Sequence, residues 1–196
     1  MLVLASASPR RQELLRAAGI PFTVQPANVD ETIHAGEAPS DYAKRLAREK
    51  ALTVWKRRSQ DVILGADTIV VAGDSILGKP ADPDDAVRML RMLSGREHCV
   101  ITGVAVVSAG YPLPGASNRP LVKVASEATK VLMSDISDPE IRDYVATGEP
   151  MDKAGAYAIQ GIASRWIPRI EGDYSNVVGL PLTLVYRMLK ELHFDV

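Results

Sequence analysis

The residues best suited to chemistry begin at the N-terminus, where hydroxyl side chains and two arginines follow a short apolar run at residues 2–5. Ser8 and Pro9 favour the N-cap and the first position of a helix. Arg10 and Arg11 then fall in the first helical turn, where the helix dipole already disfavours positive charge. Hydroxyls, backbone N–H groups and two guanidinium groups at a strand-to-helix turn are typical of a polyanion site. The alternative is a pair of solvated surface arginines.

A lysine interrupts the apolar stripe of the next predicted helix. Ser40 is expected to cap this helix, which runs to about Arg58, and Leu46, Lys50 and Val54 recur at four-residue spacing on one face. A lysine directed inward needs either an anionic partner or a path by which its charged end reaches water. We expect an anionic partner for Lys50, and an extended stem that reaches solvent remains the alternative.

Two acidic positions could supply that anion. Glu31, with Asp30 beside it, lies in a polar segment after a strand predicted at 22–25. Asp67 lies between two strongly strand-like runs, and the small residues at 65–67 predict a break between them. A buried aspartate needs a cation or hydrogen-bond donors, unless it serves as a turn or capping residue.

If these charges converge, they form a site for phosphoanhydride hydrolysis. Magnesium takes one or two protein carboxylates together with phosphate oxygens, and a carboxylate nearby can accept a proton from an attacking water. The sequence alone leaves open whether Asp67 or Glu31 is that base. The expected phosphate-binding cations are Arg10, Arg11, Lys50 and Lys79, with Arg96 as a further candidate, and the expected metal ligands are Glu31 and Asp67, with Asp30 as a further candidate.

Composition narrows the class of protein. The 196 residues are 46% hydrophobic with a formal net charge of −1, which predicts one domain or two intimate lobes and disfavours nucleic-acid binding. One cysteine, Cys99, excludes an internal disulfide and fits a reducing cytoplasm, where it is expected to be inert. No apolar run reaches the ~20 residues of a membrane span, and Arg10 and Arg11 come too early for a signal peptide.

Several common catalytic motifs are absent from the sequence. It contains no G-x-x-x-x-G-K-[ST] loop, no G-x-G-x-x-G after a strand, no G-x-S-x-G and no H-E-x-x-H. Only three histidines are present, and His98, at the start of a predicted strand, is expected to be structural. An ordinary P-loop NTPase, a dinucleotide-binding enzyme and a histidine-rich metal site are therefore disfavoured.

The remaining pattern alternates strands and helices and predicts an α/β domain with a mixed sheet. Its predicted elements are a helix capped by Asp82, a strand pair at 98–108 and 121–133 joined by a Pro/Gly-rich loop at 110–120, a helix at 137–148, short, partly strand-like pieces around glycines at 153–161 and 163–170, and a helix from Pro181.

Eight short sequence blocks are spread along almost the whole chain, at residues 6–15, 29–32, 47–51, 65–68, 78–80, 94–96, 155–161 and 176–181. These blocks, in this order, resemble the Maf family of nucleoside triphosphate pyrophosphatases. The resemblance implies a Maf/Ham1 (ITPase-like) fold over residues 1–196, with an elongated mixed sheet flanked by helices and a cleft between two lobes. It also implies a homodimer and a divalent cation, Mg²⁺ or Mn²⁺.

The resemblance further implies cleavage of a nucleoside triphosphate to the monophosphate and pyrophosphate. Asp67 matches the family's proton acceptor, Ser8 joins the phosphate-binding residues, and Arg10, Thr68 and Gln160 match positions that set base preference. These three residues are those of the branch that hydrolyses dTTP and UTP, and a glutamine amide can both donate to and accept from a pyrimidine edge. The alternatives are the sister branch acting on 7-methyl-GTP and a non-catalytic nucleotide-binding regulator of cell division.

Overall fold

The computed structural model describes residues 1–109 and 120–194. Its elements are β1 (Leu2–Leu4), α1 (Pro9–Ala17), β2 (Thr23–Val24), α2 (Pro39–Trp55), β3 (Val62–Ala72), β4 (Ser75–Leu77), α3 (Pro83–Leu93), β5 (Glu97–Ala109), β6 (Pro120–Leu132), α4 (Asp138–Ala146), the 3₁₀ turns η1 (Glu149–Asp152), η2 (Ala154–Ala156) and η3 (Ile162–Trp166), β7 (Arg169–Glu171), α5 (Tyr174–Val178) and α6 (Leu182–Lys190). The predicted order of strands and helices is confirmed as far as α4.

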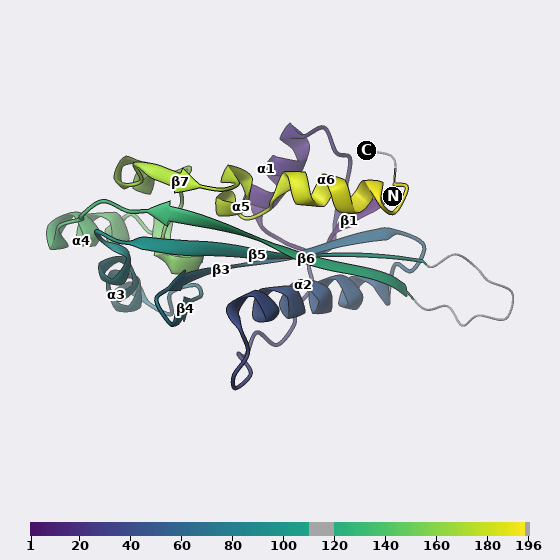
Figure 1. The fold of residues 1–196 in the computed structure, drawn as a ribbon, viewed down its shortest axis with the longest axis horizontal. Coiled ribbons are helices and arrows are strands. Elements are labelled where there is room, and N and C mark those ends of the chain that lie inside the picture. Colours follow the sequence, from purple (N-terminus) through teal and green to yellow (C-terminus); the bar gives the residue numbers. More distant parts are fainter. Residues whose placement is uncertain (110–119, 195–196) are drawn as a thin grey trace, which may run out of the picture. The chain divides into compact units, whose positions relative to one another are not determined.

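One mixed sheet carries all these strands (Figure 1). The strand order is β2-β1-β3-β5-β6-β7, and β4 pairs with β3 off this path. β1 runs parallel to β2 and β3, whereas β4 is antiparallel to β3 and β7 is antiparallel to β6. The predicted α/β class with a mixed sheet is therefore confirmed.

The chain divides into two compact units, each with its own core. The first unit comprises Met1–Asp67, Thr102–Glu127 and Gly179–Val196, and the second comprises Thr68–Ile101 and Ala128–Val178.

The first unit buries both faces of β1. Leu2 and Leu4 pack in a cluster with Leu15 of α1, and Val3, on the opposite face, packs in a cluster with Ala47 of α2. This alternation follows from the two-residue period of a strand. Figure 1 shows α2 on one side of these strands and α1 and α6 on the other. The β1–α1 turn and α2 are thereby fixed against buried β-structure.

The second unit has a separate core under α3 and α4. Leu90 of α3 and Tyr144 of α4 are buried in it together with Trp166 of η3. The rings of Tyr144 and Trp166 meet edge to face with centroids 5.4 Å apart, a favourable aromatic geometry. The irregular segment from η1 to η3 is anchored by such buried side chains.

The predicted break at 65–67 is wrong, because β3 continues through it as one strand. The small residues serve helix packing instead. A Cβ atom at Gly65 would lie 2.2 Å from the carbonyl oxygen of Ala47, and one at Gly103 would lie 2.2 Å from that of Ala43. The absence of side chains at these two positions lets the backbone of α2 lie directly on the strands.

Other local predictions were also wrong. Ser40 does not cap α2, which starts after Ala38 and ends at Trp55, short of Arg58; the Ser40 hydroxyl instead meets that of Ser126 at 3.0 Å. The segment predicted as strand-like at 153–161 forms the turn η2 and irregular backbone, and at 163–170 only the end joins a strand. The helix α5 was not predicted from the sequence.

The predicted loop at 110–120 falls outside the described residues, except for Pro120 at the start of β6. Within 1–109 and 120–194, no helix has the length and apolar character needed to cross a membrane.

Candidate active site

The turn between β1 and α1 has the predicted capped geometry. Ser8 is the N-cap, and its hydroxyl accepts a long hydrogen bond of 3.5 Å from the Arg11 N–H, while the Ser6 hydroxyl accepts one of 3.2 Å from the Ser8 N–H. Pro9 begins the helix, and Arg10 and Arg11 occupy its first turn. No acidic residue lies in that turn, so the positive end of the helix dipole and both guanidinium groups act in the same direction.

The Arg11 side chain links separate segments of the chain by hydrogen bonds. Its Nε donates to the Gly179 carbonyl at 2.8 Å, and its Nη1 donates to the Ala66 carbonyl at 2.8 Å and to the Ser6 hydroxyl at 3.1 Å. Burial lowers the pKa of the guanidinium, and the nearby charge of Arg10 adds to that effect. The carboxylates of Asp67 and Glu31 oppose the shift, so the charges of Arg10, Asp67 and Glu31 all lie within electrostatic range of Arg11.

Lys50 joins the two predicted acidic residues. Its Nζ lies 2.5 Å from Oδ1 of Asp67 and 2.7 Å from Oε1 of Glu31. The side chains of Lys50 and Asp67 are 11% and 12% exposed, whereas that of Glu31 is 55% exposed. The expected anionic partner of Lys50 is therefore present. The three side chains together carry one positive and two negative charges, which leaves a partly open, net-negative cluster.

Asp30, the further candidate for a metal ligand, forms hydrogen bonds with its own segment. Its Oδ1 accepts from the Thr32 N–H at 2.9 Å and from the Thr32 hydroxyl at 2.6 Å, and these bonds lower the pKa of the carboxyl group. This is the short-range turn that aspartate commonly forms with the backbone two residues ahead. The contacts therefore give Asp30 a role in shaping the segment that carries Glu31.

The remaining predicted site residues belong to the second unit. Thr68 follows Asp67 along β3 and is partly buried. Lys79 is exposed in the turn after β4, Arg96 is exposed between α3 and β5, and Gln160 is exposed between η2 and η3. The Gln160 turn is held by Glu149, whose Oε1 accepts from the Ile162 N–H at 3.1 Å. The charges that the structure brings together are those of the first unit.

The acidic pair fits one kind of metal site. No group of three or more His, Cys, Asp or Glu side chains within the described residues could hold an ion by itself. Mg²⁺ and related ions instead use one or two carboxylates plus substrate phosphates and water. Glu31 and Asp67, which share one ammonium partner, match that donor set.

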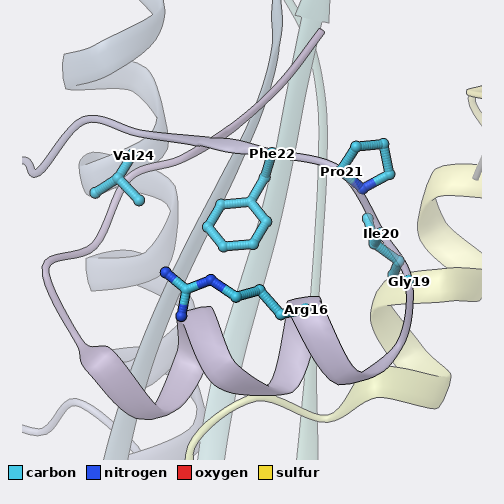
Figure 2. A pocket seen from close by; sticks show the side chains of 6 residues that line it. All are labelled: Arg16, Gly19, Ile20, Pro21, Phe22 and Val24. Carbon is cyan, nitrogen blue, oxygen red and sulfur yellow. The ribbon is translucent and has the colours of Figure 1, made fainter.

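A hollow beside β2 has a different character. Arg16, Phe22 and Val24 line it together with Gly19, Ile20 and Pro21 (Figure 2). The Arg16 guanidinium lies over the Phe22 ring, 5.7 Å from its centroid. No predicted site residue and no carboxylate lines this hollow, so it lacks the groups that phosphoanhydride chemistry needs.

Two residues of α2 beside the cluster were missed from the sequence. Tyr42 donates its hydroxyl to the Glu31 carbonyl at 2.7 Å, and Arg45 donates Nη2 to the Thr32 carbonyl at 2.9 Å. Their sequence signal was weak, because a tyrosine and an arginine on an amphipathic helix are ordinary. What distinguishes Tyr42 and Arg45 from ordinary helix residues is that they donate to two successive backbone carbonyls.

Known proteins resemble this chain over almost its whole length. A profile of the Maf family, described as Maf-like protein, matches residues 1–192. A dTTP/UTP pyrophosphatase of Koribacter versatilis is 55% identical over 96% of this chain and 93% of its own length. The protein of the same name from Geobacter sulfurreducens is 51% identical over 97% of this chain and 96% of its own length.

A solved structure has a similar fold. The Ham1 protein of Staphylococcus aureus shares 13% identity with a TM-score of 0.50, covering 97% of this chain and 98% of that chain. At this identity the likeness concerns the fold alone, and it confirms the predicted Maf/Ham1-type architecture. Because the family profile spans nearly the whole sequence and relatives share about half of its residues, the chain belongs to the Maf-like protein family.

Proposed function

We propose that this chain is a nucleoside triphosphate pyrophosphatase that converts dTTP and UTP to the monophosphate and pyrophosphate. The observation that carries the proposal is the cluster of Lys50, Asp67 and Glu31 near the arginines of the β1–α1 turn. Relatives that share about half of the sequence over nearly its full length bear the name dTTP/UTP pyrophosphatase.

In this proposal Asp67 accepts the proton of the attacking water. The reaction breaks the anhydride bond between the α- and β-phosphates, adds the water oxygen to phosphorus and leaves pyrophosphate. Lys50, 2.5 Å from the Asp67 carboxylate, holds that carboxylate in its orientation. Asp67 is mostly buried, so its position is fixed before substrate arrives, which is the preorganisation that phosphoryl transfer requires.

The cations are proposed to hold the triphosphate. Ser8, Arg10, Lys50 and Lys79 are assigned to phosphate oxygens, together with Arg11. Since Nε and Nη1 of Arg11 already donate to protein oxygen atoms, its contribution is mainly its positive charge and its hold on the turn. A divalent cation, Mg²⁺ or Mn²⁺, is proposed to be held by Glu31 and Asp67, where it would neutralise phosphate charge.

Base preference is assigned to Arg10, Thr68 and Gln160. The exposed Gln160 amide offers a donor and an acceptor, which matches the adjacent carbonyl and N–H groups of a uracil or thymine edge. A neutral reading residue selects the base without changing the charge balance at the phosphates.

The setting of the enzyme is also proposed. We assign residues 1–196 to one catalytic domain that acts as a homodimer in the cytoplasm, with nucleotides rather than nucleic acids or membranes as partners. The near-zero net charge supports nucleotides rather than nucleic acids as partners, and the single cysteine supports the cytoplasmic setting.

Pyrophosphate release from a panel of nucleoside triphosphates, with Mg²⁺ or Mn²⁺ and with EDTA, tests the proposal. We expect dTTP and UTP to be turned over fastest and EDTA to abolish turnover. Selective turnover of 7-methyl-GTP would place the chain in the sister branch. Binding of dTTP without any hydrolysis would favour a regulatory role.

A further inference from the structure

The Glu31 carboxylate reaches the site from a segment without regular structure. Between β2 and α2 the backbone forms neither helix nor strand, and the residue is exposed. Such a segment gains little order from its own backbone hydrogen bonds. Contacts from elsewhere must therefore hold Glu31 beside Lys50.

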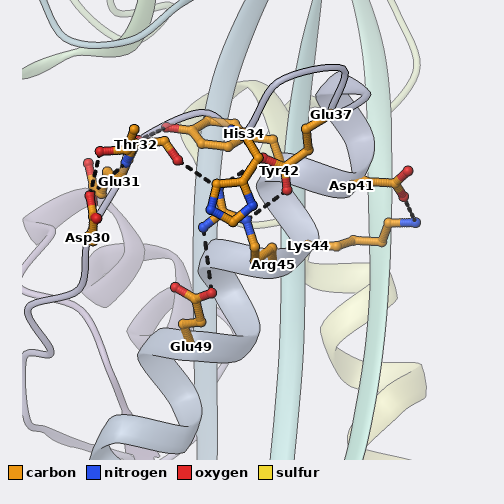
Figure 3. A network of polar contacts seen from close by, with 10 residues as sticks. All are labelled: Asp30, Glu31, Thr32, His34, Glu37, Asp41, Tyr42, Lys44, Arg45 and Glu49. Carbon is orange, nitrogen blue, oxygen red and sulfur yellow. Dashed lines mark hydrogen bonds and ion pairs between the residues drawn. The ribbon is translucent and has the colours of Figure 1, made fainter.

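Two side chains of α2 supply these contacts (Figure 3). The Tyr42 hydroxyl donates to the Glu31 carbonyl at 2.7 Å, and Arg45 Nη2 donates to the next carbonyl, that of Thr32, at 2.9 Å. Tyr42 is 7% exposed, so its hydroxyl is a fixed donor. Two successive peptide groups at Glu31 are thus bonded to the same helix that carries Lys50.

Glu37 holds the arginine in place. Its two carboxylate oxygens accept from Arg45 Nε at 2.7 Å and from Nη2 at 2.9 Å, which is the bidentate geometry typical of strong arginine–carboxylate pairs. These bonds lower the pKa of Glu37 to about 2. The guanidinium also lies over the Tyr42 ring, 5.4 Å from its centroid. The three side chains therefore act as one unit.

We propose that Tyr42, Arg45 and Glu37 form a clamp that positions the Glu31 carboxylate for the divalent cation of the triphosphate. This inference rests on the proposed function, in which Glu31 is a metal ligand. The clamp residues do not touch the substrate; they are positioning residues. They lower the entropic cost of bringing Glu31 to the ion, so the affinity for metal, rather than the chemical step, depends on them.

The test measures the Mg²⁺ concentration that gives half-maximal turnover of saturating dTTP. Tyr42→Phe removes the hydroxyl and keeps the ring. Arg45→Lys keeps the positive charge and removes the guanidinium group that donates to both Glu37 oxygens. We expect each change to raise this concentration about 3- to 10-fold, the range of one lost hydrogen bond. At saturating Mg²⁺ the kcat should change less than about twofold, because Asp67 and Lys50 are untouched.

Matched controls separate positioning from general stability. Arg91 forms a similar bidentate pair with Asp138 in the second unit, and Tyr186 is 49% exposed. Arg91→Lys and Tyr186→Phe should leave the Mg²⁺ requirement unchanged. Mn²⁺ binding to the protein with a non-hydrolysable α,β-methylene analogue of UTP, measured by electron paramagnetic resonance, provides a readout without turnover.

The Glu31→Gln variant distinguishes failure of the clamp from failure of the proposed metal role of Glu31. If Glu31→Gln raises the Mg²⁺ requirement and Tyr42→Phe does not, the clamp is overturned and the proposed metal role stands. If Glu31→Gln itself has no effect, the metal role fails and the clamp fails with it. The proposal requires that Tyr42→Phe add less than about twofold once Glu31→Gln is present, since coupled residues are non-additive.

Discussion

Two polar clusters, one in each compact unit, differ in charge and in exposure. The first unit places Lys50 between Asp67 and Glu31, with Glu31 partly open to solvent. The second unit buries Asn176, whose Nδ2 donates to the Val100 carbonyl and to the Thr129 hydroxyl, both at 3.0 Å. Asn176 and Thr129 are fully buried and neutral.

The difference indicates separate purposes. Buried neutral groups that are hydrogen-bonded to backbone carbonyls stabilise one conformation, and their removal leaves buried atoms unsatisfied. A cluster with more carboxylates than cations gains less stability and keeps charge available for a ligand. We therefore expect changes in the first cluster to affect turnover and changes in the second to affect folding.

The largest expected effect is that of Asp67→Asn. Losing the proposed proton acceptor should lower kcat about 100-fold or more, the range for a general base. Lys50 keeps Glu31 as a partner, so the free energy of unfolding should change by less than about 2 kcal/mol. Pyrophosphate release and urea denaturation measure the two quantities. Full activity, or loss of folding, would remove the contrast between the clusters.

Acid should weaken the second unit through His98. This residue is 4% exposed, its Nε2 lies 2.7 Å from the Tyr157 hydroxyl, and burial lowers its pKa to about 4 from 6.5. Between these values the unfolded chain binds the proton and the folded chain does not, so stability falls as pH drops from 6.5 to 4. The loss attributable to His98 is about 3 kcal/mol.

Urea unfolding of wild type and of His98→Asn across that pH range checks the sign. The variant is expected to be less stable at pH 7 and to have a flatter pH dependence. Equal slopes in the two proteins would show that other groups govern the acid response.

Asn176→Ala should lower the free energy of unfolding by about 2 kcal/mol, because the Val100 carbonyl and the Thr129 hydroxyl lose a buried donor. Turnover of the folded enzyme well below its melting temperature should stay within about twofold of wild type. Gln60→Ala, at an exposed amide, is the matched control. A large fall in kcat for Asn176→Ala at unchanged stability would reverse the assignment of this cluster.

The smallest effect is expected at Glu149, a charged residue of the second unit. Its carboxylate accepts from the Tyr144 hydroxyl at 2.8 Å and from the Ile162 N–H at 3.1 Å, two residues after Gln160. Glu149→Gln should shift the ratio of kcat/KM for UTP over CTP about two- to fivefold, in proportion to one weakened hydrogen bond. If both substrates lose activity equally, Glu149 supports the fold and not the choice of base.

Local signals were sufficient for much of the fold. Ser8 and Asp82 cap their helices as predicted, because a capping hydroxyl or carboxylate acts on N–H groups within three residues. The predicted partner of Lys50 was also found, since a charge in an apolar stripe must be compensated.

Contacts between residues far apart in the sequence could not be predicted from such local signals. Arg11 bonds to carbonyls of Ala66 and Gly179, 55 and 168 residues away, and nothing near Arg11 in the sequence specifies them. Gly65 resembled a strand break because glycine usually weakens strands, whereas its role depends on a helix backbone passing over it. The clamp was missed for the same reason.

The contact between Gly65 and α2 has a consequence for how the site tolerates change. A Cβ atom there would meet both the Ala47 carbonyl oxygen and, at 2.9 Å, the backbone nitrogen of Ala51, which is joined directly to Lys50. A single methyl group would have to push the helix outward and carry the ammonium group away from Asp67. The distance between α2 and β3 thus sets the distance between the Lys50 ammonium and the Asp67 carboxylate. A substitution at Gly65 that alters no charge would therefore disrupt this ion pair.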